Sequence, residues 1–281
     1  MPMEGQTAVI TGAGSGFGRA FATACAARGM KLVLADIQAE GLDATRALPE
    51  LANTAVLTQV CDVARAESVE ALAQAAEDRF GAVHLLFNNA GVAVSGPLWT
   101  ATLDEWNWAL GINLMGVVHG IRSFVPRMLK HGGAGHIVNT ASAAGLTCPA
   151  GNGIYVVSKH GVVAMSEVLY HELKMTGSKL GVSVLCPAFA PTGIANPERL
   201  RPAGMQVNPH PMAETIAQQA RKAVSKGKLS ADDIARITLE AVDTRRFYVL
   251  PHEAIKLGIE GRMKHLLEGQ APHDPFSVKA W

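Results

Sequence analysis

The regular alternation of strand-length apolar runs with helix-length segments constrains the fold of this 281-residue chain more than any other feature. The runs are rich in Val, Leu and Ile along their whole length, which is typical of strands buried on both faces of a parallel sheet. Strands that alternate with helices form crossover units, with helices on both faces of the sheet. We expect strands at about residues 6–11, 31–35, 54–60, 83–87, 136–140 and 181–186, and helices at about 16–29, 38–48, 66–80, 102–131 and 153–176.

The last third of the chain adds a helix near 230–243 and a short strand at 247–250. The whole pattern predicts an α/β fold: a doubly wound, Rossmann-type parallel sheet of about seven strands, in one domain over residues 1–281. Residues 187–228 interrupt the alternation with six prolines among apolar residues. A loop of this length is typically functional, so we interpret 187–228 as a substrate lid; the alternative is a simple surface excursion.

Composition excludes several classes of function. With 48% hydrophobic and 17% charged residues, the chain can bury a large core. Its formal net charge of +1 argues against a nucleic-acid partner. We expect no signal peptide, no membrane-spanning helix and therefore no membrane partner. Cys25, Cys61, Cys148 and Cys186 lack metal-ligand spacing, so we predict no metal site and interpret them as buried thiols of a cytoplasmic protein.

The stretch TGAGSGFG follows the first predicted strand and opens the first predicted helix. Its glycines, Gly12, Gly14, Gly16 and Gly18, can take positive φ and let another group approach the main chain closely. One interpretation is a tight strand-to-helix turn in which small residues merely allow packing. The other is a loop whose bare N–H groups, at a helix N-terminus, bind a pyrophosphate.

Asp36 ends the second predicted strand, 18 residues after Gly18. A carboxylate at this position can accept hydrogen bonds from the ribose hydroxyls of an adenosine, and it would repel a 2′-phosphate. Ala13 and Ser15, beside the glycines, bring no positive charge for such a phosphate. The sequence therefore favours NAD over NADP as cofactor, although Asp36 could also be an ordinary helix cap.

Tyr155 and Lys159 lie four residues apart in YVVSK, on one face of a predicted helix. At an effective dielectric near 20, an ammonium about 4 Å from a phenolate stabilises it by roughly 4 kcal/mol. That would bring the phenol pKa from near 10 to around neutrality before desolvation opposes the change. Such a phenol can exchange a proton with an alcohol or carbonyl oxygen. Ser142, just past the strand at 136–140, could hold the same oxygen, or be a turn hydroxyl.

Two asparagine positions complete the candidate site. NNAG, residues 88–91, follows the strand at 83–87, where a plain turn is the alternative. Asn113 lies within an apolar helix, where its amide needs a hydrogen-bond partner whether its role is catalytic or structural.

With TGAGSGFG, Asp62-Val63, NNAG, Asn113, Ser142 and YVVSK in this order, the chain closely resembles the single-domain short-chain dehydrogenases/reductases over most of its length. The resemblance implies that Tyr155 is the acid/base, Ser142 polarises the substrate oxygen, Lys159 lowers the pKa of Tyr155, and Asn113 holds a water that relays protons to Lys159. It further implies that Asp62 and Val63 contact adenine and Thr192 the nicotinamide carboxamide. The implied cofactor-binding residues are Gly12, Ser15, Gly16, Phe17, Gly18, Asp36, Asp62, Val63, Asn89, Ala90, Gly91, Tyr155, Lys159, Pro187 and Thr192.

The chain departs from the family pattern after the sixth strand, where Pro187-Ala188 replaces the usual Pro-Gly. The family also implies a homotetramer or homodimer, formed through the two long helices at 102–131 and 153–176.

These observations predict an NAD-dependent oxidoreductase that interconverts a secondary alcohol and a ketone. The presumed substrate side is small or apolar and has no arginine to clamp a carboxylate, so we expect an uncharged, hydrophobic or aromatic substrate. Two alternatives stand beside this reading: an inactive NAD-binding sensor or scaffold of the same fold, and an epimerase or dehydratase.

Overall fold

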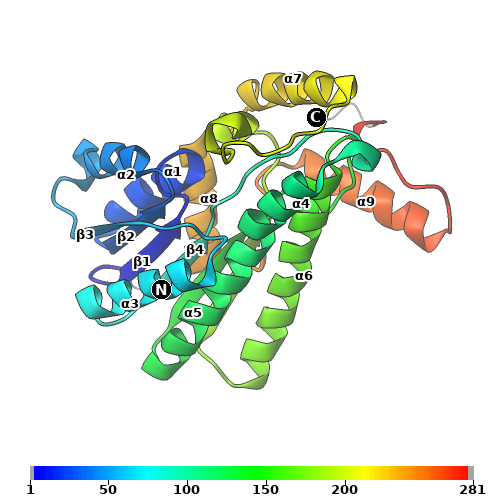
Figure 1. Cartoon of the computed structure of the whole chain (residues 1–281). Coiled ribbons are helices and arrows are strands. Elements are labelled where there is room, and N and C mark those ends of the chain that lie inside the picture. Colours follow the sequence, from blue (N-terminus) through cyan, green and yellow to red (C-terminus); the bar gives the residue numbers. More distant parts are fainter. Residues whose placement is uncertain (1–2, 278–281) are drawn as a thin grey trace.

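The computed structural model describes residues 3–277, and its centre is a seven-stranded sheet (Figure 1). The strand order is β3-β2-β1-β4-β5-β6-β7, and all neighbouring strands are parallel. This order confirms the predicted doubly wound fold, with the reversal between β1 and β4. The strands are β1 (Thr7–Thr11), β2 (Lys31–Asp36), β3 (Val56–Val60), β4 (Leu85–Asn88), β5 (Gly135–Thr140), β6 (Leu180–Leu185) and β7 (Tyr248–Val249).

Helices cover both faces of the sheet, as Figure 1 shows. They are α1 (Gly16–Ala26), α2 (Ala39–Arg46), α3 (Ala66–Phe80), α4 (Leu103–Leu110), α5 (Gly116–His131), α6 (Gly153–Met175), α7 (Pro211–Ser225), α8 (Ala231–Asp243) and α9 (Ala254–Leu267). Successive strand residues face opposite sides: Ala8 and Ile10 pack with α1 and α8, whereas Val9 packs with α3, α5 and α6. The continuous apolar runs are thus explained by burial on both faces.

The predicted helix 102–131 consists of α4, a π-helical turn at Gly111–Met115, and α5. By length and composition alone, Leu103–His131 could cross a membrane, and 44% of its most apolar window is buried. In the structure α5 packs against α3, and its His119 and Ser123 are buried within the protein. This position is that of a core helix beside a sheet.

Three features differ from the sequence predictions. The segment 187–228 is not a simple loop, because it contains the 15-residue helix α7. Helix α9 near the C-terminus was not expected. Cys25, Cys61 and Cys186 are buried as predicted, but Cys148 is exposed, because it lies in the loop that leads into α6.

Candidate functional site

A cleft of about 240 Å³ opens at the carboxyl ends of the strands on both sides of the β1/β4 reversal. Open α/β sheets bind ligands at this position. Of the predicted cofactor residues, eleven line the cleft: Gly12, Ser15, Gly16, Phe17, Asp36, Asp62, Val63, Asn89, Ala90, Gly91 and Thr192. The topology therefore brings residues from four loops and from the start of the lid to one place.

The glycine loop leaves the N-terminus of α1 open. Ser15 is the N-cap residue of α1, but its side chain makes no capping hydrogen bond, so the first N–H groups keep no side-chain partner. Gly12 and Gly16 have φ of +67° and +51°, which other residues rarely adopt. A Cβ on Gly12 would lie 2.9 Å from Ala90 Cα. An uncapped helix start with a bare backbone before it fits a bound pyrophosphate.

Gly18, by contrast, does not line the cleft. A Cβ on Gly18 would lie 2.0 Å from the carbonyl oxygen of Gly12. Gly18, the last glycine of TGAGSGFG, is therefore explained by the close packing of α1 on the loop and not by a contact with the cleft.

The carboxylate of Asp36 is held at the end of β2 by two main-chain donors. Gly14 N–H donates to Oδ2 at 2.9 Å, and Gln38 N–H donates to Oδ1 at 3.0 Å. Asp62 follows β3, the strand beside β2, and also lines the cleft; its Oδ1 accepts from Ala64 N–H at 3.0 Å. Two fixed carboxylates in the cleft wall suit the hydroxyls of a ribose and the amino group of a purine, and they disfavour an additional phosphate.

Thr11 ties the NNAG turn to β1. Its hydroxyl accepts from the N–H groups of Asn89 (2.9 Å) and Ala90 (3.1 Å), and it donates to Phe87 O at 3.2 Å. Asn89 Nδ2 returns a hydrogen bond to Thr11 O at 3.0 Å. Asn88 points into the core instead, where it donates to Asn139 Oδ1 at 2.9 Å. Three hydrogen bonds with Thr11 thus fix the turn against the glycine loop, and a fourth ties Thr11 to β4.

Ser142, Tyr155 and Lys159 meet beyond β5. The Ser142 hydroxyl follows β5, accepts from Ala144 N–H at 3.2 Å and forms a hydrogen bond with Tyr155 that favours the phenolate. Lys159, one helical turn beyond Tyr155 on α6, is buried, and its Nζ lies 5.6 Å from the centroid of the Tyr155 ring. The same ammonium donates to Thr140 O at 2.9 Å. This placement agrees with the predicted spacing.

The pKa values of this pair differ from the sequence-based expectation. Burial raises the pKa of Tyr155 to about 12, and the Ser142 hydrogen bond only partly offsets this effect. Burial likewise lowers the pKa of Lys159 to about 8. A phenol pKa near neutrality, expected before desolvation was considered, is not found in the protein alone, because burial of the phenol outweighs the Ser142 hydrogen bond.

Asn113 lies in the π-helical turn and is fully buried. Its Oδ1 accepts from Val92 N–H at 2.8 Å, while Nδ2 donates to Val92 O at 2.9 Å and to Ser158 Oγ at 3.2 Å. A Cβ on Gly91 would lie 3.2 Å from Asn113 Oδ1 and 3.5 Å from Lys159 Nζ, so both groups border the NNAG turn. The amide therefore joins the π-helical turn to the segment after β4, next to Lys159.

The segment after β6 closes the site. Pro187 O accepts from Ala143 N–H at 2.8 Å and lies 3.4 Å from Ser142 Oγ, so Pro187 supports Ser142 rather than lining the cleft. Ala188 stands where the family usually has glycine, and its N–H donates to His252 Nδ1 at 3.2 Å. Thr192 packs on Gly16, where an added Cβ would lie 3.2 Å from Thr192 Cβ.

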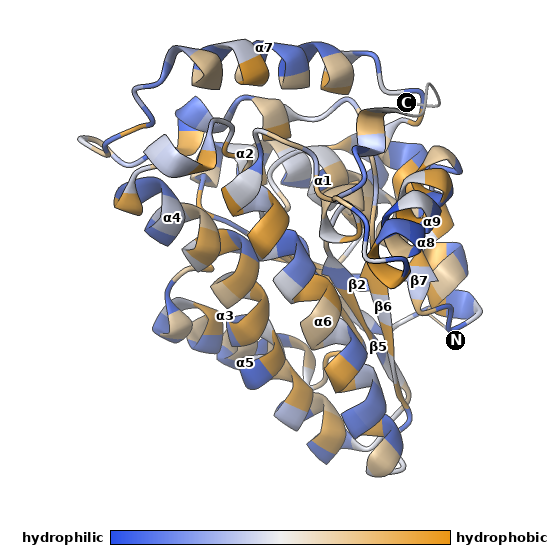
Figure 2. Ribbon diagram, turned by 90° about the vertical axis from the view of Figure 1, so that its right-hand side faces the viewer, coloured by the Kyte–Doolittle hydropathy of each residue, from blue (hydrophilic) through white to orange (hydrophobic). Residues whose placement is uncertain are grey.

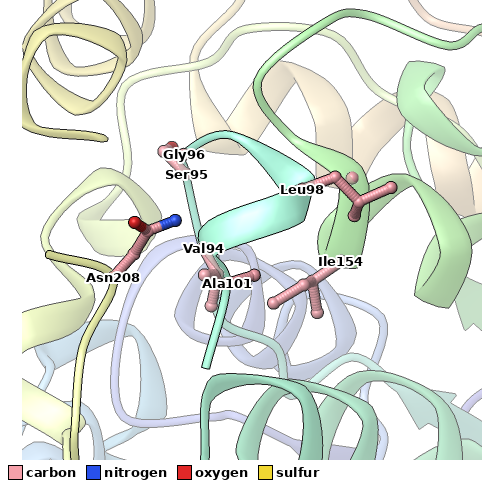
Figure 3. Close-up of a pocket in the computed structure, with 8 residues that line it drawn as sticks. Val94, Ser95, Gly96, Leu98, Ala101, Ile154 and Asn208 are labelled. Atoms are coloured by element: carbon pink, nitrogen blue, oxygen red, sulfur yellow. The ribbon is translucent and has the colours of Figure 1, made fainter. Parts of the chain in front are cut away.

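The middle of the lid, at Asn208, is fixed to the segment that follows β4. Asn208 N–H donates to Glu105 Oε1 at 3.0 Å, and its Nδ2 donates to Pro97 O at 3.1 Å. Figure 3 shows Asn208 beside Ser95 and Gly96, at a small cavity that Leu98 and Ile154 also line. With a volume of about 10 Å³, this cavity holds at most one water molecule. It is a packing gap under the lid, and the functional cleft is the larger one.

Gly96→Ala tests this attachment. Gly96 has φ of +144°, and an added Cβ would lie 2.6 Å from Asn208 Nδ2. We expect the free energy of unfolding to fall by about 1–3 kcal/mol, measured by urea denaturation, because a non-glycine residue is strained there and displaces Asn208. Gly204→Ala, in the lid with φ of +77° and open space around it, is the control for backbone strain alone. Equal losses in the two variants would contradict the attachment.

Several cleft residues were not predicted from the sequence. Trp108 and Ile112 come from α4 and the π-helical turn, Gln38 follows Asp36 by two positions, and Arg199 and Leu200 come from the lid. Gln38 could have been predicted as a cleft residue, because it follows Asp36, the last residue of β2, by only two positions. Arg199 and Leu200 carried no such signal, because they lie in the short turn Pro197–Leu200, which has no periodic pattern in the sequence.

Comparisons with known proteins agree with this geometry. A family model described as short chain dehydrogenase matches residues 6–202. A CLA biosynthesis dehydrogenase/reductase from Lactiplantibacillus plantarum is 34% identical over 268 residues, which cover 94% of this chain and 93% of that protein. A C alpha-dehydrogenase from a Sphingobium strain is 32% identical over 273 residues, covering 96% and 88%.

A solved structure is also closely similar. The crystal structure of a short chain dehydrogenase/reductase from Burkholderia phymatum in complex with NAD superposes with a TM-score of 0.96. The two chains are 48% identical, and the match covers 99% of this chain and all of the other.

Proposed function

The chain belongs to the short-chain dehydrogenase family, and from this premise we propose that it is an NAD-dependent oxidoreductase that interconverts a secondary alcohol and a ketone. The observation that carries the proposal is the meeting of Ser142, Tyr155 and Lys159 beside a cleft lined by eleven predicted cofactor residues. A proton-transfer group and a dinucleotide site in one place are what such a reaction needs.

The chain's own residues would handle the proton and the orientation of the substrate. NAD, when bound, supplies the hydride acceptor or donor at its nicotinamide ring. Ser142 Oγ orients the substrate oxygen, and the Tyr155 hydroxyl takes the alcohol proton in oxidation or returns it in reduction. Lys159, when protonated, stabilises the phenolate form of Tyr155. Asn113 holds the segment after β4 against Lys159 through its two hydrogen bonds to Val92.

Asp36 supports NAD as the cofactor in place of NADP. Its carboxylate is fixed by Gly14 and Gln38 at the end of β2, where it would accept from a ribose hydroxyl and repel a 2′-phosphate. The solved relative from Burkholderia phymatum, 48% identical, was crystallised with NAD. Both observations point to the same cofactor.

The substrate class follows from the surroundings of Ser142. Ala143 and Ala144, which follow it, are buried and apolar. Ile194 and Leu200 of the lid line the adjoining cleft, where the guanidinium of Arg199 is directed away to Gln38 and Ser15. Transfer of a carboxylate or phosphate into such surroundings without a cationic partner is costly. We infer an uncharged, hydrophobic or aromatic secondary alcohol or ketone as substrate.

A homotetramer or homodimer is part of this proposal. Helices α5 and α6 lie side by side, and apolar residues recur along both (Figures 1 and 2). Val157, Val168 and Met175 of α6 are exposed. Exposed apolar residues of this number on paired helices suit a contact with a second copy, in a cytoplasmic assembly.

The test uses matched alcohols. Purified protein is given NAD with 1-phenylethanol, or with mandelate, which replaces the methyl group by a carboxylate. We expect NADH formation, with kcat/KM at least about tenfold higher for 1-phenylethanol, and a preference for NAD over NADP. If only carboxylate- or phosphate-bearing alcohols reacted, the substrate class would be wrong. NAD binding without turnover of any alcohol or ketone would favour the inactive sensor instead.

A further inference from the structure

The guanidinium of Arg199 spans the mouth of the cofactor cleft. Its Nη1 donates to Gln38 Oε1 at 2.9 Å, and its Nη2 lies 3.4 Å from Ser15 Oγ. Ser15 and Gln38 are the N-cap residues of α1 and α2, the helices that follow β1 and β2. One lid side chain therefore bridges the starts of both helices at the edge where the dinucleotide site lies.

Packing of the lid fixes this position. Leu200, the next residue, packs on the apolar cluster that includes Val92, Ala109 and Ile154. A Cβ on Gly193 would lie 3.0 Å from Arg199 Nη2, so the glycine leaves the space that the guanidinium occupies. The short helical turn Pro197–Leu200 is thus docked over the cleft with Arg199 directed toward the glycine loop.

The electrostatics of the cleft give this arginine a role. Among the described residues that line the cleft, Asp36 and Asp62 are acidic and Arg199 is the one with a permanent positive charge. A positive charge near two carboxylates would strengthen the binding of a pyrophosphate beyond what main-chain N–H groups supply. A planar guanidinium is well suited, because it donates two parallel hydrogen bonds to phosphate oxygens.

We propose that Arg199 binds the pyrophosphate of NAD and thereby holds the lid turn 197–200 closed over the bound cofactor. This inference rests on the proposed function, since it concerns the same cleft. The competing ligand for Arg199 is a 2′-phosphate, as found in NADP. The fixed carboxylate of Asp36, together with the contact of Arg199 to Ser15 at the start of α1, favours the pyrophosphate.

The experiment measures ligand binding by calorimetry, without turnover. Wild type, Arg199→Ala and Arg199→Lys are titrated with NAD, ADP-ribose, adenosine and NADP. Lys222→Ala is the control, because it removes one exposed positive charge from α7 of the same lid. We expect Arg199→Ala to weaken NAD and ADP-ribose about tenfold or more, with a smaller loss for Arg199→Lys. Adenosine binding, which involves no phosphate, should change less than about twofold.

A second readout follows the lid itself. In wild type and Lys222→Ala, NAD should slow amide hydrogen exchange in residues 197–208, whereas in Arg199→Ala this protection should be lost. The exposed position of Arg199 makes a folding defect easy to exclude, since the ligand-free variants should melt at the temperature of wild type.

Three results would overturn the inference. Unchanged NAD affinity in Arg199→Ala excludes a pyrophosphate contact. An equal loss for adenosine, or for NAD in Lys222→Ala, shows a general effect. A loss confined to NADP assigns Arg199 to the 2′-phosphate. A wild type that binds no NAD at all would instead contradict the proposed function.

Discussion

Replacing Tyr155 by phenylalanine is expected to lower kcat by about 100- to 10,000-fold, the usual range for loss of a general acid/base. The phenylalanine ring retains the packing of the half-buried tyrosine and removes only the hydroxyl that hydrogen bonds with Ser142. NAD affinity should change less than about twofold, because the cleft walls come from other segments. Steady-state kinetics and calorimetry on the same preparation measure the two quantities.

Tyr170→Phe provides the matched control. Tyr170 lies on the same helix, α6, where its ring packs against Phe247 at 5.1 Å between centroids, far along the helix from Ser142. Its hydroxyl should be dispensable for turnover. If Tyr155→Phe kept more than a tenth of the wild-type kcat, another group would have to move the proton. If it lost NAD binding in parallel, the residue would be structural.

Most of the fold follows from the sequence, for an identifiable reason. Strands such as Leu32–Ala35 and Leu85–Phe87 are buried on both faces, so their apolar runs are continuous and easily distinguished from helices. The glycine loop and Asp36 were predictable because each requires a particular residue type at a strand end. The helices α7 and α9 were not expected: the apolar residues of α9 show little helical periodicity, whereas those of α7 recur at helical spacing but lie in a proline-rich segment that was interpreted as a loop.

In the candidate site, too, local features were predictable from the sequence and long-range features were not. Spacing places Tyr155 and Lys159 on one helical face, and the structure agrees. Their pKa values depend on how much water surrounds them, which is a property of the assembled site and cannot be obtained from spacing. Arg199 is a similar case, since its contact with Ser15 joins residues 184 positions apart. Local patterns carry no information about such pairs.

Lys159→Met should change both the pH dependence of the free energy of unfolding of the cofactor-free protein and its kcat. Lys159 is 2% exposed, its ammonium donates to Thr140 O, and burial lowers its pKa from 10.5 to about 8. Between pH 8 and 10.5 the unfolded chain therefore binds more protons than the folded one, and the contribution of Lys159 to stability rises with pH. Below pH 8 the buried charge costs about 3 kcal/mol relative to its neutral form.

We therefore expect the free energy of unfolding of Lys159→Met, relative to wild type, to fall by about 3 kcal/mol between pH 7 and pH 10.5, measured by urea denaturation. The lost hydrogen bond to Thr140 adds a constant that is independent of pH. Tyr155 and Cys186 do not disturb the comparison, because burial raises the pKa of each to about 12 and keeps both protonated in either folded protein.

The same substitution should lower kcat at least about 100-fold, since the phenolate of Tyr155 loses its stabilising charge. Lys159→Arg is the charge-preserving comparison, and it should not reproduce the pH dependence of wild type, because a guanidinium stays charged throughout this range. A pH-independent stability difference between Lys159→Met and wild type would show that Lys159 is not desolvated. The cost of this buried charge at neutral pH is explained by the role that we propose for Lys159 at Tyr155, because the hydrogen bond to Thr140 does not itself require a charged donor.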